Sequence, residues 1–206
     1  SEQLARALAD QALVGFAPSL RETDPPQALA LLERFRLLCA HRRGPDGVDS
    51  VNLVVERALE DAGLVTRGGA RAARWYRGRP LLVTRNDYAL GLFNGDVGVV
   101  VDSAEGARAY FVTAAGSRFL APSRLPPHET VFATSIHKSQ GSEFDEVAIV
   151  LPDARSPLLT RELLYTAVTR ARSRVTVYGS EASLREAVSR CIQRATGLTE
   201  ALADAR

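Results

Sequence analysis

The sequence predicts an α/β protein whose parallel sheet is interrupted by a small β-rich insert. The apolar runs FRLLCA, at residues 35–40, and EVAIVLP, at residues 146–152, are typical of strands buried on both faces. Helical patterns alternate with such strands at both ends of the chain, which indicates parallel strands joined by helices. Between them, four or five short β-rich segments separated by turn residues predict a small barrel.

The chain begins with two expected helices and a strand. Apolar residues recur at helical spacing near the start, which predicts a first helix over residues 1–17. Pro26 suits the first turn of a second helix, over about residues 26–34, because a first-turn N–H has no helical partner to lose. The buried strand at residues 35–40 follows directly.

A third helix is expected after the polar loop HRRGPDG, at residues 41–47. Asp49 or Ser50 can cap its first turn, and Gly63 can end it just after Ala62. The insert is then expected to occupy residues 78–126. Its strand segments read RPLLVTRN, VGVVVDS, ARAYFVTA and SRFLAP, with a strong turn signal at Asn94-Gly95-Asp96.

Residues 127–206 return to strands and helices. The runs VFATS, EVAIVLP and RVTVYG are expected to be strands of the parallel sheet. Helices are expected over residues 160–172 and 181–196. The insert therefore leaves and re-enters a single α/β domain, which consists of residues 1–77 and 127–206.

Composition narrows the function without identifying it. A net charge of +2 gives no global electrostatic attraction to nucleic acid, so any such contact must be local. No apolar run approaches the roughly 20 residues that span a bilayer, and no secretory signal is visible, so we expect a cytoplasmic protein without a membrane partner. Cys39 and Cys191 have no metal-ligand spacing; we expect both to pack in the core and expect no metal site.

Lys138 is the only lysine, since 26 Lys and Arg residues include 25 arginines. A P-loop places a glycine directly before its lysine, whereas His137 precedes Lys138. The acid pair Asp145-Glu146 precedes its strand, while a Walker B carboxylate follows one. This chain alone therefore cannot hold Mg-ATP in the usual way.

The segment SIHKSQGSEF, at residues 135–144, follows a predicted strand and so should lie at the carboxyl edge of the sheet, where α/β ligands bind. Gly141 lets a ligand approach the backbone, and Glu143 can accept a hydrogen bond from a ribose hydroxyl. The alternative is a polar loop without a ligand. Donors suited to phosphate oxygens are Ser135, His137, Lys138, Ser139 and Gln140.

Two arginine clusters are candidates for contacts with phosphate. Arg170, Arg172 and Arg174 would fan out over a helix, so at most one or two can reach one point as an arginine finger. Stabilisation of the helix end by its own dipole is the alternative. Arg42 and Arg43 follow the strand at residues 35–40 and should reach the carboxyl edge; the alternative is a solvated loop.

A third basic segment, RGGARAARWYRGR at residues 67–79, contains five arginines and the pair Trp75-Tyr76. Arginines interleaved with aromatic rings suit a nucleic-acid backbone and its bases. A connector that is rich in arginine through coding bias is the favoured alternative.

These segments together resemble the motifs of superfamily 1 helicases. SIHKSQGSEFDEVAIVLP resembles motif V, RELLYTAVTRARSRV motif VI, and RLLCAHRRGPDGV the motif IV region. The insert, with RPLLVTRNDYALGLFNGDVGVV and the later PSRLPPHET, resembles the insertion of the RecD family, the alpha subunits of the RecBCD helicase–nuclease, exonuclease V. Their shared order makes the resemblance specific from about Leu31 onward.

The resemblance implies a RecA-like second motor domain, 2A, at residues 1–77 and 127–206, with an SH3-like 2B domain at residues 78–126. It implies that the first RecA-like domain is missing, that this N-terminal half of the same protein mainly holds ATP and Mg²⁺, and that the chain is inactive alone. Arg170 matches the motif VI arginine that reaches the γ-phosphate across the cleft. Arg42, or else Arg43, matches the motif IV arginine, and the resemblance implies that Arg42 and Arg170 act as catalytic residues that both bind ATP and neutralise charge on the transferred phosphoryl group.

Within motif V, the resemblance places Gly141 and Glu143 at the nucleotide-facing end. It places Ser135, His137 and Lys138 at the DNA-facing end, together with Ser139 and Gln140. The family usually has threonine at the position of Ser135, which departs from it but keeps the hydroxyl. We hypothesise that lysine persists at position 138 because a compact ammonium fits a tight turn beside a phosphate better than a guanidinium does.

The implied function is the C-terminal motor half of an ATP-dependent, 5′ to 3′ DNA helicase subunit of RecBCD in double-strand break repair and recombination. Single-stranded DNA and RecB- and RecC-like subunits are the implied partners. The alternatives are a stand-alone RecD-like helicase and a non-catalytic module that binds DNA or protein. A nuclease is disfavoured because no Asp, Glu and Lys cluster has metal-binding spacing.

Overall fold

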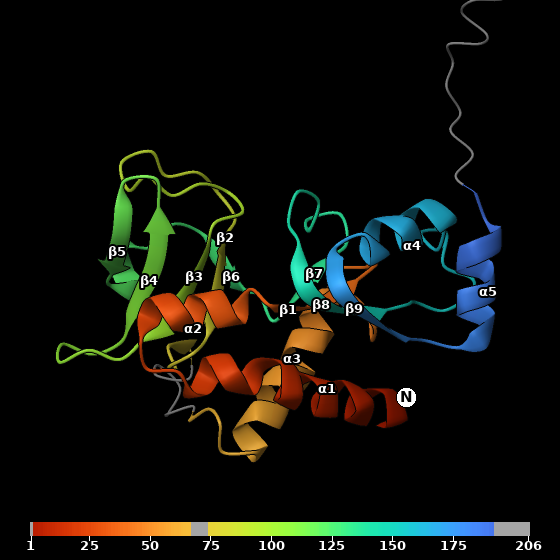
Figure 1. The fold of residues 1–206 in the computed structure, drawn as a ribbon, viewed down its shortest axis with the longest axis horizontal. Coiled ribbons are helices and arrows are strands. Elements are labelled where there is room, and N and C mark those ends of the chain that lie inside the picture. The colour runs from red at the N-terminus through yellow and green to blue at the C-terminus, as the bar shows by residue number, and fades with distance from the viewer. Residues whose placement is uncertain (1, 67–73, 192–206) are drawn as a thin grey trace, which may run out of the picture.

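Two β-sheets lie side by side in the computed structural model, which describes residues 2–66 and 74–191 (Figure 1). The sheet on the right of Figure 1 has four strands, all parallel, in the order β7-β1-β8-β9. Because every strand runs the same way, this sheet has one carboxyl edge and one amino edge. Its strands are β1 (Phe35–Cys39), β7 (Ala133–Ser135), β8 (Phe144–Val150) and β9 (Ala171–Tyr178).

Helices cover both faces of the parallel sheet, which explains why its central strands β1 and β8 are mostly apolar. Successive residues of β1 point to opposite faces: Leu37 joins the apolar cluster of Phe16 and Val55, while Leu38 joins that of Ile149. One face carries α1 (Glu2–Arg21) and α3 (Val48–Asp61), and the other α4 (Arg161–Val168) and α5 (Glu181–Ser189) (Figure 1).

The insert forms a second, antiparallel sheet in the order β5-β4-β3-β2-β6. Its own apolar core includes Leu81, Leu92 and Phe111. A fifth strand, β6, lies beyond the predicted end at residue 126, so the insert runs on to Thr130. The strands β5 and β6 are the edges of this order, and closure into an SH3-like barrel stays a prediction. The bounds are β2 (Pro80–Val83), β3 (Val97–Val101), β4 (Arg108–Thr113), β5 (Gly116–Leu120), the short helix η2 (Pro122–Arg124) and β6 (His128–Thr130).

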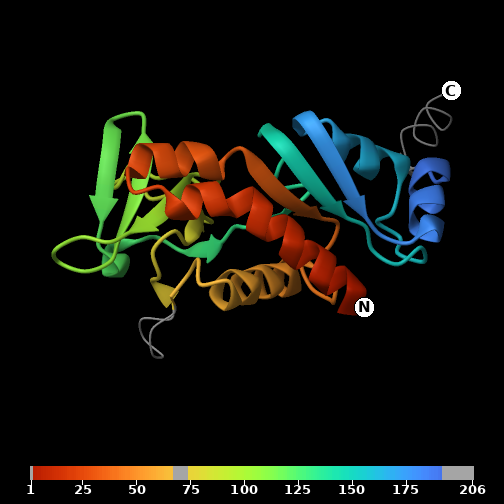
Figure 2. The ribbon, with the colours of Figure 1, turned by 60° about the horizontal axis from the view of Figure 1, so that its bottom comes forward.

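The helix α1 joins the two sheets, because it runs along both of them and leads into α2 (Pro25–Leu32) beside the insert (Figure 2). The ring of Phe16 on α1 packs edge-on against two other rings: its centre lies 5.0 Å from that of Phe35 and 4.8 Å from that of Phe132. Phe132 lies between β6 and β7, where the chain passes from the insert back to the parallel sheet. This aromatic contact therefore fixes the junction between the two sheets.

Several predicted boundaries shift at the helices. The first helix continues past residue 17 to Arg21, since Leu20 still packs in the core. The third helix starts at Val48 with Gly47 as its N-cap, so neither Asp49 nor Ser50 caps it. The helix predicted over residues 181–196 ends at Ser189, and residues 192–196 lie outside the described part.

The helix predicted over residues 160–172 is shorter than expected. It ends at Val168, where the hydroxyl of Thr169 donates to the carbonyl of Tyr165. Arg172 and Arg174 therefore lie on the strand β9 and not on a helix, in keeping with the alternating pattern of ARSRVTVY.

The two cysteines differ in exposure. Cys39 is buried, and burial raises the pKa of its thiol to about 12, whereas Cys191 is exposed and the prediction that it packs in the core is wrong. No helix in residues 2–66 or 74–191 is both long enough and apolar enough to cross a membrane.

We predict that Gly15→Ala destabilises the fold, although alanine is normally the better helix former by about 1 kcal/mol. A Cβ at Gly15 would overlap the buried ring of Phe35, so α1 would have to move off the sheet. The free energy of unfolding in urea should fall by about 1–3 kcal/mol. Val14→Ala, at a neighbouring position that is 75% exposed, should change it by no more than about 0.5 kcal/mol. A stabilising Gly15→Ala would contradict this packing.

Candidate functional site

The loop at residues 136–143 crosses the parallel sheet from one edge to the other. Cys39 pairs with both Ser135 and Val150, so β7 and β8 end at the same level. From Val150 back to the start of β8 at Phe144, six residue steps cover about 20 Å. The loop must travel that distance, so its beginning lies at the carboxyl edge and its end at the amino edge.

A turn holds the first half of this loop. The backbone N–H of Ser139 donates to the carbonyl of Ser135 at 3.1 Å, and that of Lys138 to the hydroxyl of Ser135 at 3.3 Å. Ile136 and Ser139 are buried, and the Ser139 hydroxyl donates to the carbonyl of Ile136 at 2.7 Å. Of the predicted phosphate donors, Ser139 therefore serves the turn itself. His137, Lys138 and Gln140 are exposed.

At the carboxyl edge, Glu129 holds two cations. Its Oε1 accepts a hydrogen bond from Lys138 Nζ at 2.7 Å, and its Oε2 accepts one from Arg42 Nη2 at 2.9 Å. Asp49 lies 3.8 Å from Arg42 Nε. Sequence analysis predicted that Arg42 and Lys138 reach the same edge, and the structure places them there, but it did not single out Glu129. We call Glu129, Arg42 and Lys138 the carboxyl-edge cluster.

At the amino edge, Arg170 donates only to uncharged oxygens. These are the carbonyls of Ser142 and Thr166, each at 3.1 Å, and the hydroxyl of Thr169 at 3.3 Å. Among the described residues, no carboxylate pairs with its guanidinium. These bonds fix the direction of the side chain but leave its full charge uncompensated.

The two arginines that follow Arg170 are neutralised. Arg172 pairs with Glu143 at 3.2 Å, and Arg174 pairs with Glu146 at 3.5 Å. The predicted ribose acceptor Glu143 is therefore already engaged, although its side chain is 59% exposed. Of these three arginines, Arg170 is the one whose guanidinium has no carboxylate partner among the described residues.

The structure does not bring Arg42 and Arg170 together, contrary to the expectation that both face one phosphate. Arg42 follows the carboxyl end of β1, whereas Arg170 precedes the amino end of β9. Parallel strands put these two positions at opposite edges, separated by roughly the 20 Å length of β8. Arg42 belongs to the carboxyl-edge cluster and not to the surface around Arg170.

A cavity of about 840 Å³ lies between the loop and the insert. The helix α2, the turn between β2 and β3 and the loop itself form its walls. Its lining includes Leu29, Arg36, Asn94, Val97, Lys138 and Glu143. The cavity therefore extends along the loop between its two polar ends.

Arg36 lines this cavity although it lies within the buried strand β1. It is 2% exposed, donates to the carbonyl of Val131, and has its guanidinium carbon 5.1 Å from the centre of the Phe144 ring. Burial lowers its pKa to about 10, an effect that Glu33 opposes, so it stays a cation at neutral pH. Sequence analysis overlooked this residue, although a charge inside an apolar run was a signal.

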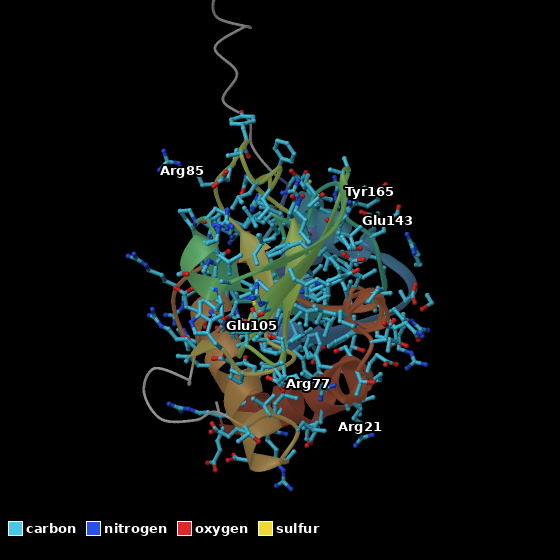
Figure 3. The ribbon with its side chains drawn as sticks, turned by 90° about the vertical axis from the view of Figure 1, so that its left-hand side faces the viewer. Arg21, Arg77, Arg85, Glu105, Glu143 and Tyr165 are labelled. Carbon is cyan, nitrogen blue, oxygen red and sulfur yellow. The ribbon has the colours of Figure 1, made fainter. Side chains whose placement is uncertain are left out.

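The surface of the amino edge also presents an exposed ring. Figure 3 shows Glu143 and Tyr165 on the same side of the molecule, away from Arg85 of the insert. Tyr165 lies on α4 and is 69% exposed. Across residues 2–66 and 74–191, no three His, Cys, Asp or Glu side chains gather into a group that could hold a metal ion.

The basic segment at residues 67–79 is only partly described, because residues 67–73 lie outside the described part. In the remainder, the Arg79 guanidinium lies 5.5 Å from the centre of the Trp75 ring. Tyr76 is buried, and its hydroxyl donates to Glu56 at 2.6 Å. These described side chains pack against the protein itself and present no row of free rings for bases.

Comparison with known proteins shows which family this chain belongs to. Residues 130–178 match the family model of the UvrD-like helicase C-terminal domain. The RecBCD enzyme subunit RecD of Mycolicibacterium smegmatis is 51% identical over 93% of this chain and 34% of that protein. The subunit of the same name from Mycobacterium tuberculosis is 52% identical over 83% of this chain and 29% of that protein.

A protein named ATP-dependent RecD2 DNA helicase, from Deinococcus radiodurans, is 36% identical over 83% of this chain and 23% of its own length. The chain thus spans about a third or less of the length of these relatives.

We predict that the backbone at Gly141 constrains the second half of the loop. Its φ is +87°, and a Cβ there would meet no atom within 4 Å, so a substitution would strain only the backbone. Gly141→Val should lower the free energy of unfolding by about 1–2 kcal/mol, and Gly141→Asn by clearly less, since asparagine tolerates positive φ. Thermal melting would measure both, with Ser142→Val as the neighbouring control. Equal losses for Val and Asn would contradict the conformational explanation.

Proposed function

Because the chain belongs to the RecD family of superfamily 1 helicases, we propose that it is part of the motor of an ATP-dependent DNA helicase. The two ends of the loop at residues 136–143 would serve the two ligands of that motor. The amino-edge end would face ATP, and the carboxyl-edge end would face single-stranded DNA.

The observation that carries the proposal is the uncompensated charge of Arg170. A positioned guanidinium can stabilise the charge that develops on a transferred phosphoryl group. This chain has no glycine-lysine phosphate loop, so a separate domain must hold the triphosphate and Mg²⁺. Arg170 would reach that triphosphate across the cleft between the domains, close to Gly141 and Glu143.

The contact with single-stranded DNA would involve Ser135, His137, Lys138 and Gln140 at the other end of the loop, joined by Arg42. Lys138 and Arg42 are two exposed donors that share the carboxylate of Glu129, and Asp49 lies 3.8 Å from Arg42 Nε, so a phosphate would bind here by displacing these carboxylates from the cations. Such contacts are insensitive to base sequence and weaken with salt.

The wider role is proposed from the family. Relatives named RecBCD enzyme subunit RecD support a subunit of a RecBCD-like enzyme, with RecB- and RecC-like partners. Movement in the 5′ to 3′ direction and a role in recombination and double-strand break repair are proposed from the motif resemblance alone. The similarity to a protein named as an ATP-dependent DNA helicase keeps a stand-alone helicase as the second candidate. A non-catalytic binding module is less favoured, because it would not require Arg170 to be unpaired.

We predict that Arg170→Gln in the full-length protein lowers DNA-dependent ATP hydrolysis by about 10³-fold or more, as expected for an arginine finger. Arg172→Gln is the matched control: its guanidinium is neutralised by Glu143, so the rate should fall much less. Melting temperatures would show that both variants fold. Unchanged hydrolysis in Arg170→Gln together with lost assembly would favour a binding module instead.

We also predict that Lys138→Gln weakens binding of single-stranded DNA equally for all sequences. The slope of log affinity against log salt should become shallower by about 0.7, because one phosphate contact is lost. Lys138→Arg should keep the slope but lose affinity, since a guanidinium fits the turn less well. Arg185→Gln, on α5 and 78% exposed, controls for net charge. Wild-type binding and slope in Lys138→Gln would remove Lys138 from the DNA site.

A further inference from the structure

Glu129 connects three segments of the chain, of which the one that carries Arg42 is far from the other two in the sequence. It lies on β6 of the insert, Arg42 follows β1, and Lys138 lies in the loop after β7. Its side chain is 21% exposed, against 59% for Arg42 and 41% for Lys138. The carboxylate is therefore more buried than the two cations that it holds, and both cations remain open to solvent.

Both cations extend from backbone that is already fixed. The carbonyl of Arg42 accepts the N–H of Asp49 at 3.1 Å, which joins Arg42 to the first turn of α3. The N–H of Lys138 donates to the hydroxyl of Ser135 at 3.3 Å. Only the long side chains are free to move, and Glu129 is the group that brings their ends to one place.

Stability is a poor reason for this arrangement. Ion pairs with exposed partners contribute little to folding, because water screens the charges and ordering the side chains costs entropy. The two cations also repel each other, and this repulsion offsets part of their attraction to the shared carboxylate. The cluster is better explained by what it offers a ligand: two cationic donors held side by side by one carboxylate, with Asp49 as a second carboxylate 3.8 Å from Arg42 Nε.

We infer that Glu129 is a positioning residue that holds Arg42 and Lys138 as a paired phosphate contact, weakens that contact enough for release, and links it to the insert. This inference rests on the proposed DNA contact at Lys138. A motor must release each phosphate that it grips, and a carboxylate that competes for both cations lowers the cost of release. Without Glu129, the two cations would bind a phosphate more tightly, but their side chains would be less fixed in position.

The link to the insert follows from the position of β6. Glu129 pairs with Leu82 of β2 in the antiparallel sheet, while its side chain reaches the loop of the parallel sheet. A movement of the insert relative to the parallel sheet would therefore withdraw the carboxylate from both cations together. This gives the insert a direct way to change the grip on DNA.

The test is Glu129→Gln in the full-length protein, with binding to an oligothymidine measured over a range of salt concentrations. The amide keeps the shape of the side chain and removes its charge. Affinity at low salt should rise by about threefold to tenfold, and the salt slope should steepen by up to about 0.7. Glu129→Asp keeps the charge, so its slope should stay that of the wild type even where the shorter side chain lowers stability.

Glu186→Gln is the matched control, because Glu186 is 35% exposed and pairs with Arg190 at 2.7 Å on α5. It changes the net charge by the same amount, so an equal gain in both variants would overturn the inference. The gain should also vanish when Glu129→Gln is combined with Lys138→Gln and Arg42→Gln, as a shared contact requires.

Two results would separate this inference from the proposed function. If Lys138→Gln weakens DNA binding but Glu129→Gln leaves affinity and slope unchanged, the DNA site stands and the role of Glu129 is overturned. If Lys138→Gln itself has no effect on binding, the proposed DNA contact fails and the inference fails with it. Tighter binding and a steeper slope that require both cations would support it.

Discussion

The path of the loop at residues 136–143 is the constraint on which the arrangement of the site depends. It joins two parallel strands that lie on either side of β1, so it must run against the strand direction and cross the sheet from edge to edge. Covering about 20 Å while its first half forms a turn, it has little slack, because eight extended residues reach at most about 28 Å. Its two polar ends are thus held apart and held in place by the same strands.

The charged side chains near the two ends of the loop are paired in opposite ways. At the amino edge, Arg170 is fixed by neutral oxygens and keeps its whole charge, while Arg172 beside it is cancelled by Glu143. At the carboxyl edge, one carboxylate is shared between two cations. An uncompensated charge on a fixed side chain suits the brief stabilisation of charge that phosphoryl transfer requires. A partly cancelled pair suits a contact that forms and breaks at each step.

The parallel sheet could be predicted because burial on both faces leaves mostly apolar runs, as in β1 and in the second half of β8. The end of the insert could not, since β6 has only three residues and its sequence, His-Glu-Thr, carries no apolar pattern. The pairing of β6 with β2 is a long-range contact, and local sequence does not record it. Glu129 was missed for a related reason, because its importance comes from its contacts with Arg42, which is 87 residues away, and with Lys138, and neither contact follows a local sequence pattern.

The misplacement of Arg42 has a similar origin. The sequence predicts that Arg42 follows a strand and lies at the carboxyl edge, and the structure places it there. The resemblance to helicases, however, implied that Arg42 and Arg170 act on the same phosphate. Only the direction of β9, which Arg170 precedes, shows that the two lie at opposite edges. The alternation of Arg172 and Arg174 contained that information, because a period of two indicates a strand that begins just after Arg170.

A continuous series of contacts joins the two edges and then reaches the insert. Arg170 donates to the carbonyl of Ser142 at one end of the loop, and Lys138 binds Glu129 of β6 at the other. A loop with little slack transmits part of a displacement along its length. If Arg170 is drawn toward a nucleotide, Ser142 is pulled with it, and the turn that carries Lys138 must yield or follow. Under the proposed function, the same backbone would therefore carry the state of the nucleotide to the grip on DNA, with the insert able to act on that grip through Glu129.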